Sequence, residues 1–224
     1  MLLNINKPAG LSSHDVVDKI RRITSERRVG HAGTLDPFAT GVLVIGVSRS
    51  STRKLGEISK NSQKEYLATM QLGQISSTGD LEGQINRTAE LANINQLTNE
   101  TIESALANFR GEITQTPPAY SALKINGTPA YKLARRGIKV QLAPRQVKIY
   151  ELELVNFTAP CLQIKVSCSA GTYIRTLAED IGKDLQLGGA YLTELTRTRV
   201  GEFKLEQSLT LEEAALFWQK TLEP

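Results

Sequence analysis

Apolar and polar residues alternate along several short stretches of the chain, as expected for half-buried β-strands. The alternation is cleanest near the middle of the C-terminal half, where Leu162, Ile164, Val166 and Cys168 are separated by polar residues. Similar alternation, or a short apolar run, predicts further strands at residues 2–5, 42–47, 66–72, 147–155 and 191–199. An Asn-Gly pair at 126–127 predicts a tight hairpin turn.

Apolar residues at helical spacing predict the helices. In the first helix the apolar stripe consists of Val16, Val17, Ile20 and Ile23. Ser12 and Asp15 suit the start of this helix. Further helices are predicted at 48–58, 101–109 (closed by Gly111), 130–136 and 211–222.

Two stretches complete this pattern. Residues 171–185 are predicted to be a strand end that leads into a helix, and residues 74–97 are polar and irregular. Strands and helices do not alternate regularly along the chain. The pattern therefore predicts an α+β fold with a mixed, mostly antiparallel central sheet flanked by helices.

The length of 224 residues suits a single domain over 1–224, in which residues 113–150 form an inserted, thumb-like segment over one face. No apolar stretch approaches the length of a membrane span, and the N-terminus lacks the features of a signal peptide. Cys161 and Cys168 are predicted on opposite faces of one strand, and two cysteines with two histidines argue against a zinc site. We expect a reduced, cytoplasmic monomer.

The distribution of charge points to a polyanionic partner. The net charge is only +4, but there is no acidic residue between Ile113 and Tyr150. That stretch contains seven basic residues: Lys124, Lys132, Arg135, Arg136, Lys139, Arg145 and Lys148. Scattered basic residues usually form a solvated surface. The lack of acids and the interleaved tyrosines favour a segment that binds an RNA backbone, for which Lys124, Lys132, Arg135 and Arg136 are the candidates.

The most informative loop has the sequence GHAGTLDPFATGVLVIG, residues 30–46, and contains His31 and Asp36. Pro37 restricts the backbone of Asp36, and the apolar run that follows anchors the loop on a strand. A carboxylate held in this way is a candidate nucleophile or base. The alternative is an ordinary Asp-Pro turn.

A second candidate stretch is GTYIRT, residues 171–176. If it is extended, Tyr173 and Arg175 share one face, where the arginine could orient a carboxylate and the tyrosine could stack on a base or move a proton. Alternatively, Tyr173 is a half-buried sheet residue and Arg175 a surface charge. The chain has no P-loop, no GxGxxG after a strand and no GxSxG elbow, which argues against several other enzyme classes.

Several motifs resemble those of the TruB family of pseudouridine synthases, which isomerise the T-loop uridine of tRNA at position 55. They are NKPAGLSSHDVV, GHAGTLDPFATGVL, KEYLATMQLG, TPPAYSALKINGTPAYKLARRGI and CSAGTYIRTLAEDIG, in this order along nearly the whole chain. The resemblance implies an isomerase that needs no cofactor and whose partner is the T-arm of tRNA.

The resemblance also implies roles for single residues. Asp36 is the catalytic aspartate, and Arg175 is its ion-pair partner. Tyr173 lies against the flipped base and takes the proton from the re-bonded carbon. Tyr66 stacks on the target uracil, although its place in a strand, taken alone, favours a core residue.

Three further positions follow from the same motifs. Leu195 completes the apolar wall of the pocket, His31 packs into the T-loop, and Lys7-Pro8 is a structural motif near the site. Ser77 stands where relatives often carry an acid, so we transfer no role to it, whereas Asp80 is retained.

The implied reaction flips the uridine, cleaves the glycosidic bond with the help of Asp36, rotates the base and re-bonds it through C5. Asp36 could act at the ribose C1′, at C6 or through a glycal. The chain ends soon after these motifs, so we expect it to lack the C-terminal PUA domain common in the family and to recognise the T-arm alone. The alternatives are an RNA-binding or tRNA-folding module, or a pseudouridine synthase that acts on another RNA.

Overall fold

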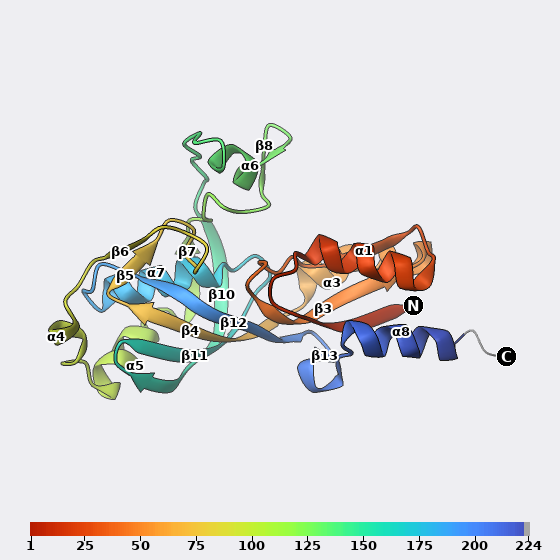
Figure 1. The fold of residues 1–224 in the computed structure, drawn as a ribbon. Helices are drawn as coiled ribbons and strands as arrows, with labels where there is room; N and C mark the ends of the chain where they lie inside the picture. Colours follow the sequence, from red (N-terminus) through yellow and green to blue (C-terminus); the bar gives the residue numbers. More distant parts are fainter. Residues whose placement is uncertain (222–224) are drawn as a thin grey trace. The chain divides into compact units, whose positions relative to one another are not determined.

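The structure is a computed structural model that describes residues 1–221. Its central sheet is mixed and mostly antiparallel and is flanked by helices, which confirms the fold class predicted from the sequence (Figure 1). The strand order is β1-β3-β12-β4-β11-β10-β7, with β2 beside β3 and β13 beside β12. The chain divides into two compact units, and β4, β11 and β12 contribute residues to both.

The first unit contains residues 1–67, 167–170 and those from Glu194 onward. Its elements are β1 (Leu2–Lys7), α1 (Ser13–Thr24), β2 (Val29–Ala32), β3 (Thr40–Val47), α2 (Arg49–Thr52), α3 (Leu55–Asn61), β13 (Phe203–Lys204), a 3₁₀ turn (Leu205–Gln207) and α8 (Leu211–Lys220). The shared strands are β4 (Lys64–Leu72), β11 (Cys161–Cys168) and β12 (Ala190–Val200).

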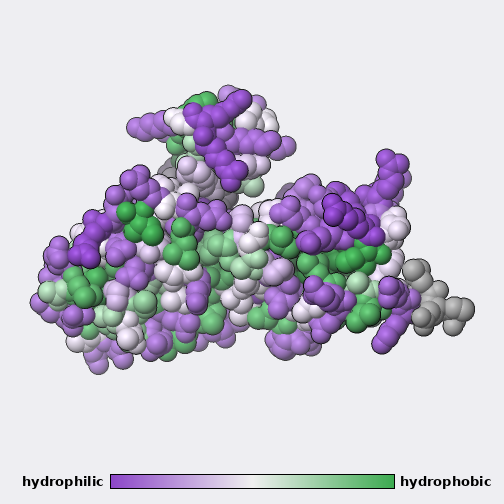
Figure 2. Space-filling view, in the orientation of Figure 1, coloured by the Kyte–Doolittle hydropathy of each residue, from purple (hydrophilic) through white to green (hydrophobic). Residues whose placement is uncertain are grey.

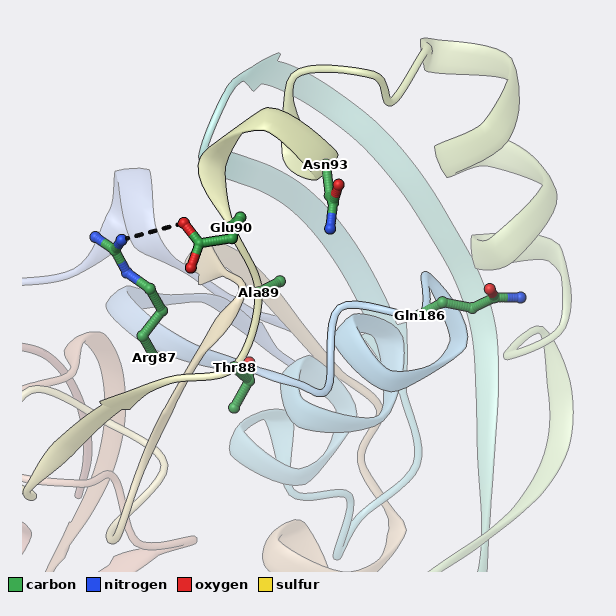
Figure 3. Close-up of a pocket in the computed structure, with 6 residues that line it drawn as sticks. All are labelled: Arg87, Thr88, Ala89, Glu90, Asn93 and Gln186. Carbon is green, nitrogen blue, oxygen red and sulfur yellow. Dashed lines mark ion pairs between the residues drawn. The ribbon is translucent and has the colours of Figure 1, made fainter.

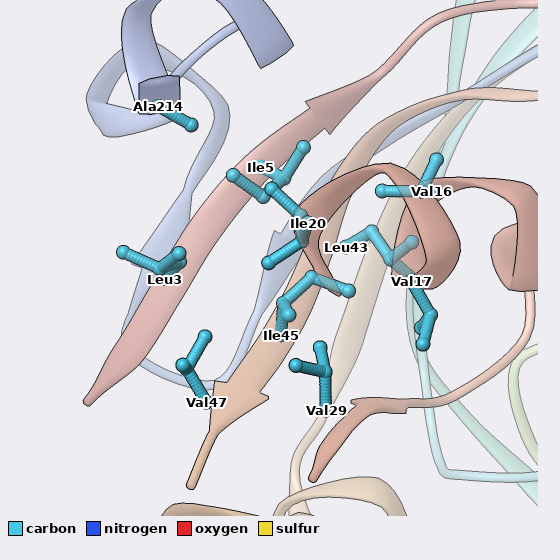
Figure 4. Packing of buried hydrophobic residues seen from close by; sticks show 10 residues of the cluster. All are labelled: Leu3, Ile5, Val16, Val17, Ile20, Val29, Leu43, Ile45, Val47 and Ala214. Carbon is cyan, nitrogen blue, oxygen red and sulfur yellow. The ribbon is translucent and has the colours of Figure 1, made fainter. Parts of the chain in front are cut away.

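The core of the first unit lies between α1, α8 and the strands β1, β2 and β3 (Figure 4). Helix α1 begins as predicted, because Ser12 and Asp15 form a reciprocal capping box. Its apolar stripe buries Val16, Val17 and Ile20 against the strands. Strand β3 pairs with β1 and β2 in antiparallel register and is almost completely buried. The loop that carries Asp36 therefore joins two strands anchored in a packed core.

The second unit contains residues 68–166 and 171–193. Its own elements are β5 (Gln74–Ser76), β6 (Ile85–Arg87), α4 (Leu91–Ile94), α5 (Asn99–Ala107), β7 (Gly111–Gln115), β8 (Lys124–Ile125), β9 (Thr128–Pro129), α6 (Ala130–Ala134), β10 (Arg145–Thr158) and α7 (Ile174–Asp184). Strand β7 pairs with the start of β10, so residues 116–144 form an excursion between two paired strands. We call residues 116–144 the basic segment. In Figure 1 its elements β8 and α6 extend away from the ends of β7 and β10.

The predicted turn of the basic segment is confirmed. Asn126 and Gly127 both have positive φ, 49° and 82°, as a type I′ turn requires, and they join β8 to β9. Helix α6 follows directly, and the chain then turns at Gly137, where φ is +73°.

Several boundaries differ from the predictions. The region 74–97 is not wholly irregular, since it forms the β5–β6 hairpin and α4. The predicted helix at 48–58 is split into α2 and α3. Gly111 does not close a helix but opens β7 with φ of +90°, after α5 has ended at Ala107. The C-terminal helix was predicted to reach residue 222, which lies outside the described residues.

The burial of β4 follows the predicted alternation. Tyr66, Ala68, Met70 and Leu72 are all buried and separated by half-buried residues. Cys161 is exposed and Cys168 is buried, as expected for opposite faces of one strand. No helix in the described part of the chain is long and apolar enough to cross a membrane.

Candidate active site

Asp36 lies in the loop between β2 and β3 and is half-buried. Its carbonyl oxygen accepts a hydrogen bond from the Ala39 N–H at 3.1 Å, so residues 36–39 form a hydrogen-bonded turn. On one side of the turn, the hydroxyl of Ser13 at the start of α1 accepts from the Leu35 N–H at 2.8 Å and donates to the Leu35 carbonyl at 3.2 Å. The backbone around Asp36 is thus tied to the first turn of α1.

Lys7 holds the other side of the turn. It is completely buried, and its Nζ donates to the carbonyl oxygens of Pro8, Leu11 and Pro37 at 2.9, 2.6 and 3.0 Å. Burial lowers the pKa of Lys7 from 10.5 to about 8, although the negative charge of Asp36 acts in the opposite direction. The buried ammonium therefore lies close to the candidate carboxylate and fixes the residue that follows it.

Arg197 on β12 is a second buried cation of this unit, with 1% of its surface exposed. Its Nε donates to the Val42 carbonyl at 2.7 Å, and one of its terminal nitrogens donates to the Gly33 carbonyl at 3.0 Å. These two carbonyls lie before and after Asp36 in the chain. Arg197 thus joins both arms of the loop, a role that the sequence analysis did not predict.

The same guanidinium reaches Tyr66 on β4. Tyr66 is 8% exposed; burial raises the pKa of its phenol, whereas a hydrogen bond with Arg197 acts in the opposite direction. Two residues earlier in the chain, the Nζ of buried Lys64 donates to the carbonyls of Ser59 and Ser62 at 2.6 and 2.7 Å. Burial lowers the pKa of Lys64 to about 8. Lys64 and Tyr66, at the start of β4, are therefore both held in place by hydrogen bonds.

The remaining candidates of this unit are His31 and Leu195. His31 is half-buried on β2, and burial lowers its pKa, with the charge of Arg197 contributing in the same direction. Leu195 is buried on β12, two positions before Arg197. The roles implied for both, contact with the T-loop and with the base, stay predictions.

Tyr173 and Arg175 lie in the second unit, where the helix expected within residues 171–185 starts at Ile174. The stretch is not extended throughout: Tyr173 is the extended N-cap of α7, with φ of −99° and ψ of 111°, and Arg175 is already the second residue of the helix. The two side chains therefore do not share a strand face. The helix begins at Ile174 because Ile174, Leu177, Ala178 and Ile181 form a buried stripe.

Arg175 is buried and not a surface charge, with 5% of its surface exposed. Its Nη1 donates to the Thr78 carbonyl at 2.7 Å and lies 3.8 Å from an Asp80 carboxylate oxygen. Its Nη2 donates to the Tyr120 carbonyl at 2.8 Å. Asp80 is itself buried and accepts from the Thr78 hydroxyl at 2.5 Å. Asp80 is thus a partner of Arg175 for which the sequence analysis predicted no role.

The four candidate RNA-backbone residues, Lys124, Lys132, Arg135 and Arg136, lie on the basic segment. The Arg135 guanidinium lies 5.7 Å from the centre of the Tyr131 ring, within the range of a cation–π contact. Figure 2 shows a mostly hydrophilic surface over this segment. The segment therefore presents a cation next to an aromatic ring, a combination that suits both backbone neutralisation and base stacking.

An open depression of about 420 Å³ lies elsewhere on the second unit, and its lining consists of Arg87, Thr88, Ala89, Glu90, Asn93 and Gln186 (Figure 3). An exposed ion pair joins Arg87 to Glu90, two residues of this lining, at 3.7 Å. The predicted site residues lie outside this lining. The depression is thus lined mostly by polar, solvated side chains such as those found on most protein surfaces.

The predicted site residues therefore fall into two groups. His31, Asp36, Tyr66 and Leu195 belong to the first unit, and Tyr173 and Arg175 to the second. Within the first unit, Arg197 connects the loop of Asp36 to Tyr66. The ion pair between Asp36 and Arg175 stays a prediction.

Comparison with known proteins assigns the chain to a family. The model of the TruB family pseudouridylate synthase N-terminal domain matches residues 21–174, and that of the tRNA pseudouridylate synthase B C-terminal domain matches residues 175–224. A protein named tRNA pseudouridine synthase B from Francisella philomiragia is 50% identical over 93% of this chain and 67% of its own length. The protein of that name from Mycobacteroides abscessus is 48% identical over 96% of this chain and 72% of its own length.

Solved structures with a similar fold include a chain from a Cbf5-Nop10-Gar1 complex. It is 30% identical with a TM-score of 0.74, and the match covers all of this chain and 56% of the other. A chain from the archaeal box H/ACA sRNP Nop10-Cbf5 complex is 29% identical with a TM-score of 0.69, over 97% of this chain and 53% of the other. The chain thus spans little more than half the length of these solved chains. From the family match and these identities, the chain belongs to the TruB family of pseudouridylate synthases.

Proposed function

We propose that this chain isomerises the T-loop uridine of tRNA, at position 55, with Asp36 as the catalytic group. The chain is an isomerase that converts uridine to pseudouridine in tRNA, as its family membership implies. The observation that supports Asp36 most strongly is the set of bonds around its loop. Lys7 and Arg197, both buried, donate to carbonyls on either side of it. A carboxylate on so rigid a loop is pre-organised for chemistry.

The reaction begins with extrusion of the uridine, because its ring is inaccessible within a folded loop. Tyr66 stacks on the uracil, and Leu195 closes the apolar wall. Asp36 then promotes cleavage of the glycosidic bond, by attack at C1′, by addition at C6 or through a glycal. The detached base rotates and re-bonds through C5, and any bond that Asp36 has formed is broken. The phenol of Tyr173 takes the proton that leaves C5 while its own proton passes to solvent, and N1 of the base takes up one proton. The product contains all atoms of the substrate, so the reaction balances without an oxidant or a hydrolytic water.

Arg175 orients the carboxylate of Asp36 in this proposal. An arginine presents five N–H donors in a planar fork and can therefore contact two carboxylates at once. Asp80 is one of them, at 3.8 Å. The hydrogen bonds to the carbonyls of Thr78 and Tyr120 fix the plane of the guanidinium. This fixed cation would keep Asp36 ionised when the base enters.

The basic segment supports the T-arm as substrate. Its cations, Lys124, Lys132, Arg135 and Arg136, would neutralise backbone phosphates, and Tyr131 offers a stacking surface. The same segment supports a second candidate function, an RNA-binding or tRNA-folding module that does not need the chemistry. The two functions differ in what they require of Asp36.

Pseudouridine mapping across total RNA tests the proposal. Cells with the gene, without it, and with the Asp36→Asn variant are compared. The proposal predicts that loss of the gene removes pseudouridine from position 55 of tRNAs and that the variant does not restore it. Loss of pseudouridine from another RNA instead would identify a different substrate. Rescue of growth by Asp36→Asn, but not by charge reversal at Arg135 and Arg136, would favour the RNA-binding module.

A further inference from the structure

The basic segment leaves and re-enters the sheet at two residues that lie opposite each other. It leaves after Gln115, the last residue of β7, and returns at Arg145, the first residue of β10. Gln115 and Arg145 are direct partners in the antiparallel register of these strands. We call this pair the root of the basic segment. Both of its side chains contact the turn that carries Tyr173.

Gln115 contacts the backbone of Tyr173 with both ends of its amide. The residue is 1% exposed. Its Nε2 donates to the Tyr173 carbonyl at 3.0 Å, and its Oε1 accepts from the Tyr173 N–H at 2.8 Å. Two bonds to the backbone of one residue fix its orientation as a neighbouring strand would. Tyr173 is the N-cap residue of α7, and its own side chain makes no capping hydrogen bond. The two bonds from Gln115 are therefore important for holding this residue in place.

Arg145 contacts the ring of the same tyrosine. Its guanidinium carbon lies 4.8 Å from the centre of the Tyr173 ring, within cation–π range. One of its terminal nitrogens also donates to the carbonyl of Gly171, two residues before Tyr173. The backbone of Tyr173 is therefore held from one strand and its ring from the other.

A third contact connects the start of the basic segment to the same helix. The carbonyl of Tyr120, five residues beyond Gln115, accepts from Nη2 of Arg175. The segment that carries the candidate RNA-binding cations is thus bonded to both candidate residues of the second unit, to Tyr173 at its root and to Arg175 through Tyr120. A different arrangement of the root would displace Tyr173.

We propose that Gln115 is a positioning residue for Tyr173, acting with Arg145 so that the root of the basic segment places the tyrosine against the base. This inference rests on the proposed function, in which Tyr173 takes the proton from C5. The proposal assigns two different roles to two parts of the basic segment. The cations along the segment contribute to binding of RNA, whereas the root contributes to the rate of the chemical step.

Kinetics on a T-arm transcript test this separation. Gln115→Met keeps the size of the side chain and removes both hydrogen bonds, and Gln115→Glu keeps the acceptor for the Tyr173 N–H. A displacement of a reacting group by about 1 Å costs up to about 100-fold in rate, so we expect Gln115→Met to lower kcat about 10- to 100-fold with KM changed less than about twofold. Gln115→Glu sets a carboxylate oxygen against the Tyr173 carbonyl in place of the donor, so we expect it to lower kcat as well. Gln146→Met, at an exposed glutamine on β10, is the matched control and should leave both constants unchanged.

Fluorine NMR provides a readout that does not depend on turnover. The protein is labelled with 3-fluorotyrosine, and the Tyr173 signal is assigned from Tyr173→Phe. In Gln115→Met this signal should shift or broaden while the other tyrosine signals stay in place. If Gln115→Met does not fold, Gln115→Glu, which also loses one of the two bonds, decides the question with the same measurement.

An unchanged Tyr173 signal together with wild-type kcat would overturn the inference. Failure of the proposed function gives a different result. If Tyr173→Phe itself turns over at the wild-type rate, the tyrosine takes no proton, and the signal of Tyr173 in Gln115→Met still decides whether Gln115 positions it.

Discussion

The ammonium nitrogen of Lys7 lies 3.0 Å from the carbonyl oxygen of Pro37, the residue directly after Asp36. This one bond crosses from the end of β1 to the candidate catalytic loop. Lys7 also donates to the carbonyls of Pro8 and Leu11, so the ammonium uses all three of its protons in bonds to the backbone. A neutral amine has only two protons to donate. The loop should therefore be sensitive to the charge of Lys7.

We predict that kcat falls as the pH rises through about 8, the pKa to which burial lowers Lys7. A neutral amine can hold only two of the three carbonyl oxygens, and we expect a decrease of about threefold, corresponding to about 0.7 kcal/mol, the worth of one modest hydrogen bond. The measurement is kcat at saturating RNA between about pH 7 and about pH 9.

Stability should move in the other direction. The pKa of Lys7 in the folded chain lies below its ordinary value of 10.5, so between these two values the unfolded chain binds more protons. The contribution of Lys7 to stability therefore rises with pH in that range. Lys64 has a similar pKa, and Lys64→Met tests whether it causes the change in kcat. A profile that is flat in the wild type, or that persists in Lys7→Met, would contradict the role of Lys7.

Gly41 and Gly10 form a matched pair for testing how tightly the loop packs. Both have positive φ, +100° and +82°. A methyl group at Gly41 would overlap the backbone carbonyl of Arg197, whereas one at Gly10 would have no atom of residues 1–221 within 4 Å. We expect Gly10→Ala to lower the free energy of unfolding by about 1–2 kcal/mol, through backbone strain alone, and Gly41→Ala to cost at least about 2 kcal/mol more. Chemical denaturation measures both, and equal losses would show that Arg197 does not pack there.

Charge reversal on the basic segment should weaken RNA binding in a salt-dependent way. We expect Arg135→Glu with Arg136→Glu to raise KM and to reduce the slope of log K against log salt by about one for each phosphate that is no longer neutralised. Because these residues lie far along the segment from its root, kcat should stay near the wild-type value. Lys220→Glu, an exposed reversal on α8, is the control. A slope that does not change would exclude contact of these arginines with phosphate.

Tyr66 should contribute through its ring more than through its hydroxyl. Stacking on a base is worth about 1–3 kcal/mol, so we expect Tyr66→Leu to lower kcat/KM about 5- to 150-fold. Tyr66→Phe keeps the ring and removes the hydrogen bond to Arg197, which should cost about 1 kcal/mol of folding stability and little activity. Equal activity losses in the two variants would indicate that the hydroxyl, and not stacking, is what matters.

The sequence predicted elements best where periodicity is strong. The alternation around Tyr66 and the capping box at Ser12 and Asp15 both have their predicted structure. At Tyr173 and Arg175 the β-branched residues Thr172, Ile174 and Thr176 left an extended arrangement open, whereas the structure has the helix there. The helical spacing of the apolar residues from Ile174 onward was the stronger signal.

Long-range contacts of polar residues were harder to predict. Lys7 and Arg197 lie two residues after the buried residues Ile5 and Leu195 in the same strands. Alternating residues of a strand share a face, so the sequence already indicated that both cations are buried. Their partners were not predictable, since the carbonyls of Pro37 and Val42 lie 30 and 155 residues away in the chain. The same holds for Gln115, whose contact with Tyr173 spans 58 residues. No local pattern marks an amide that bonds to a distant peptide.

Single-turnover conversion of a T-arm transcript by Asp36→Asn is the most direct test of the account. The side chain keeps its size and loses its charge, and Asp18→Asn on α1 serves as control. We predict that the Asp36 variant binds the transcript with an affinity close to that of the wild type and forms no pseudouridine, whereas the control converts it fully. Conversion by Asp36→Asn at the wild-type rate would contradict the assignment of Asp36 as the catalytic group.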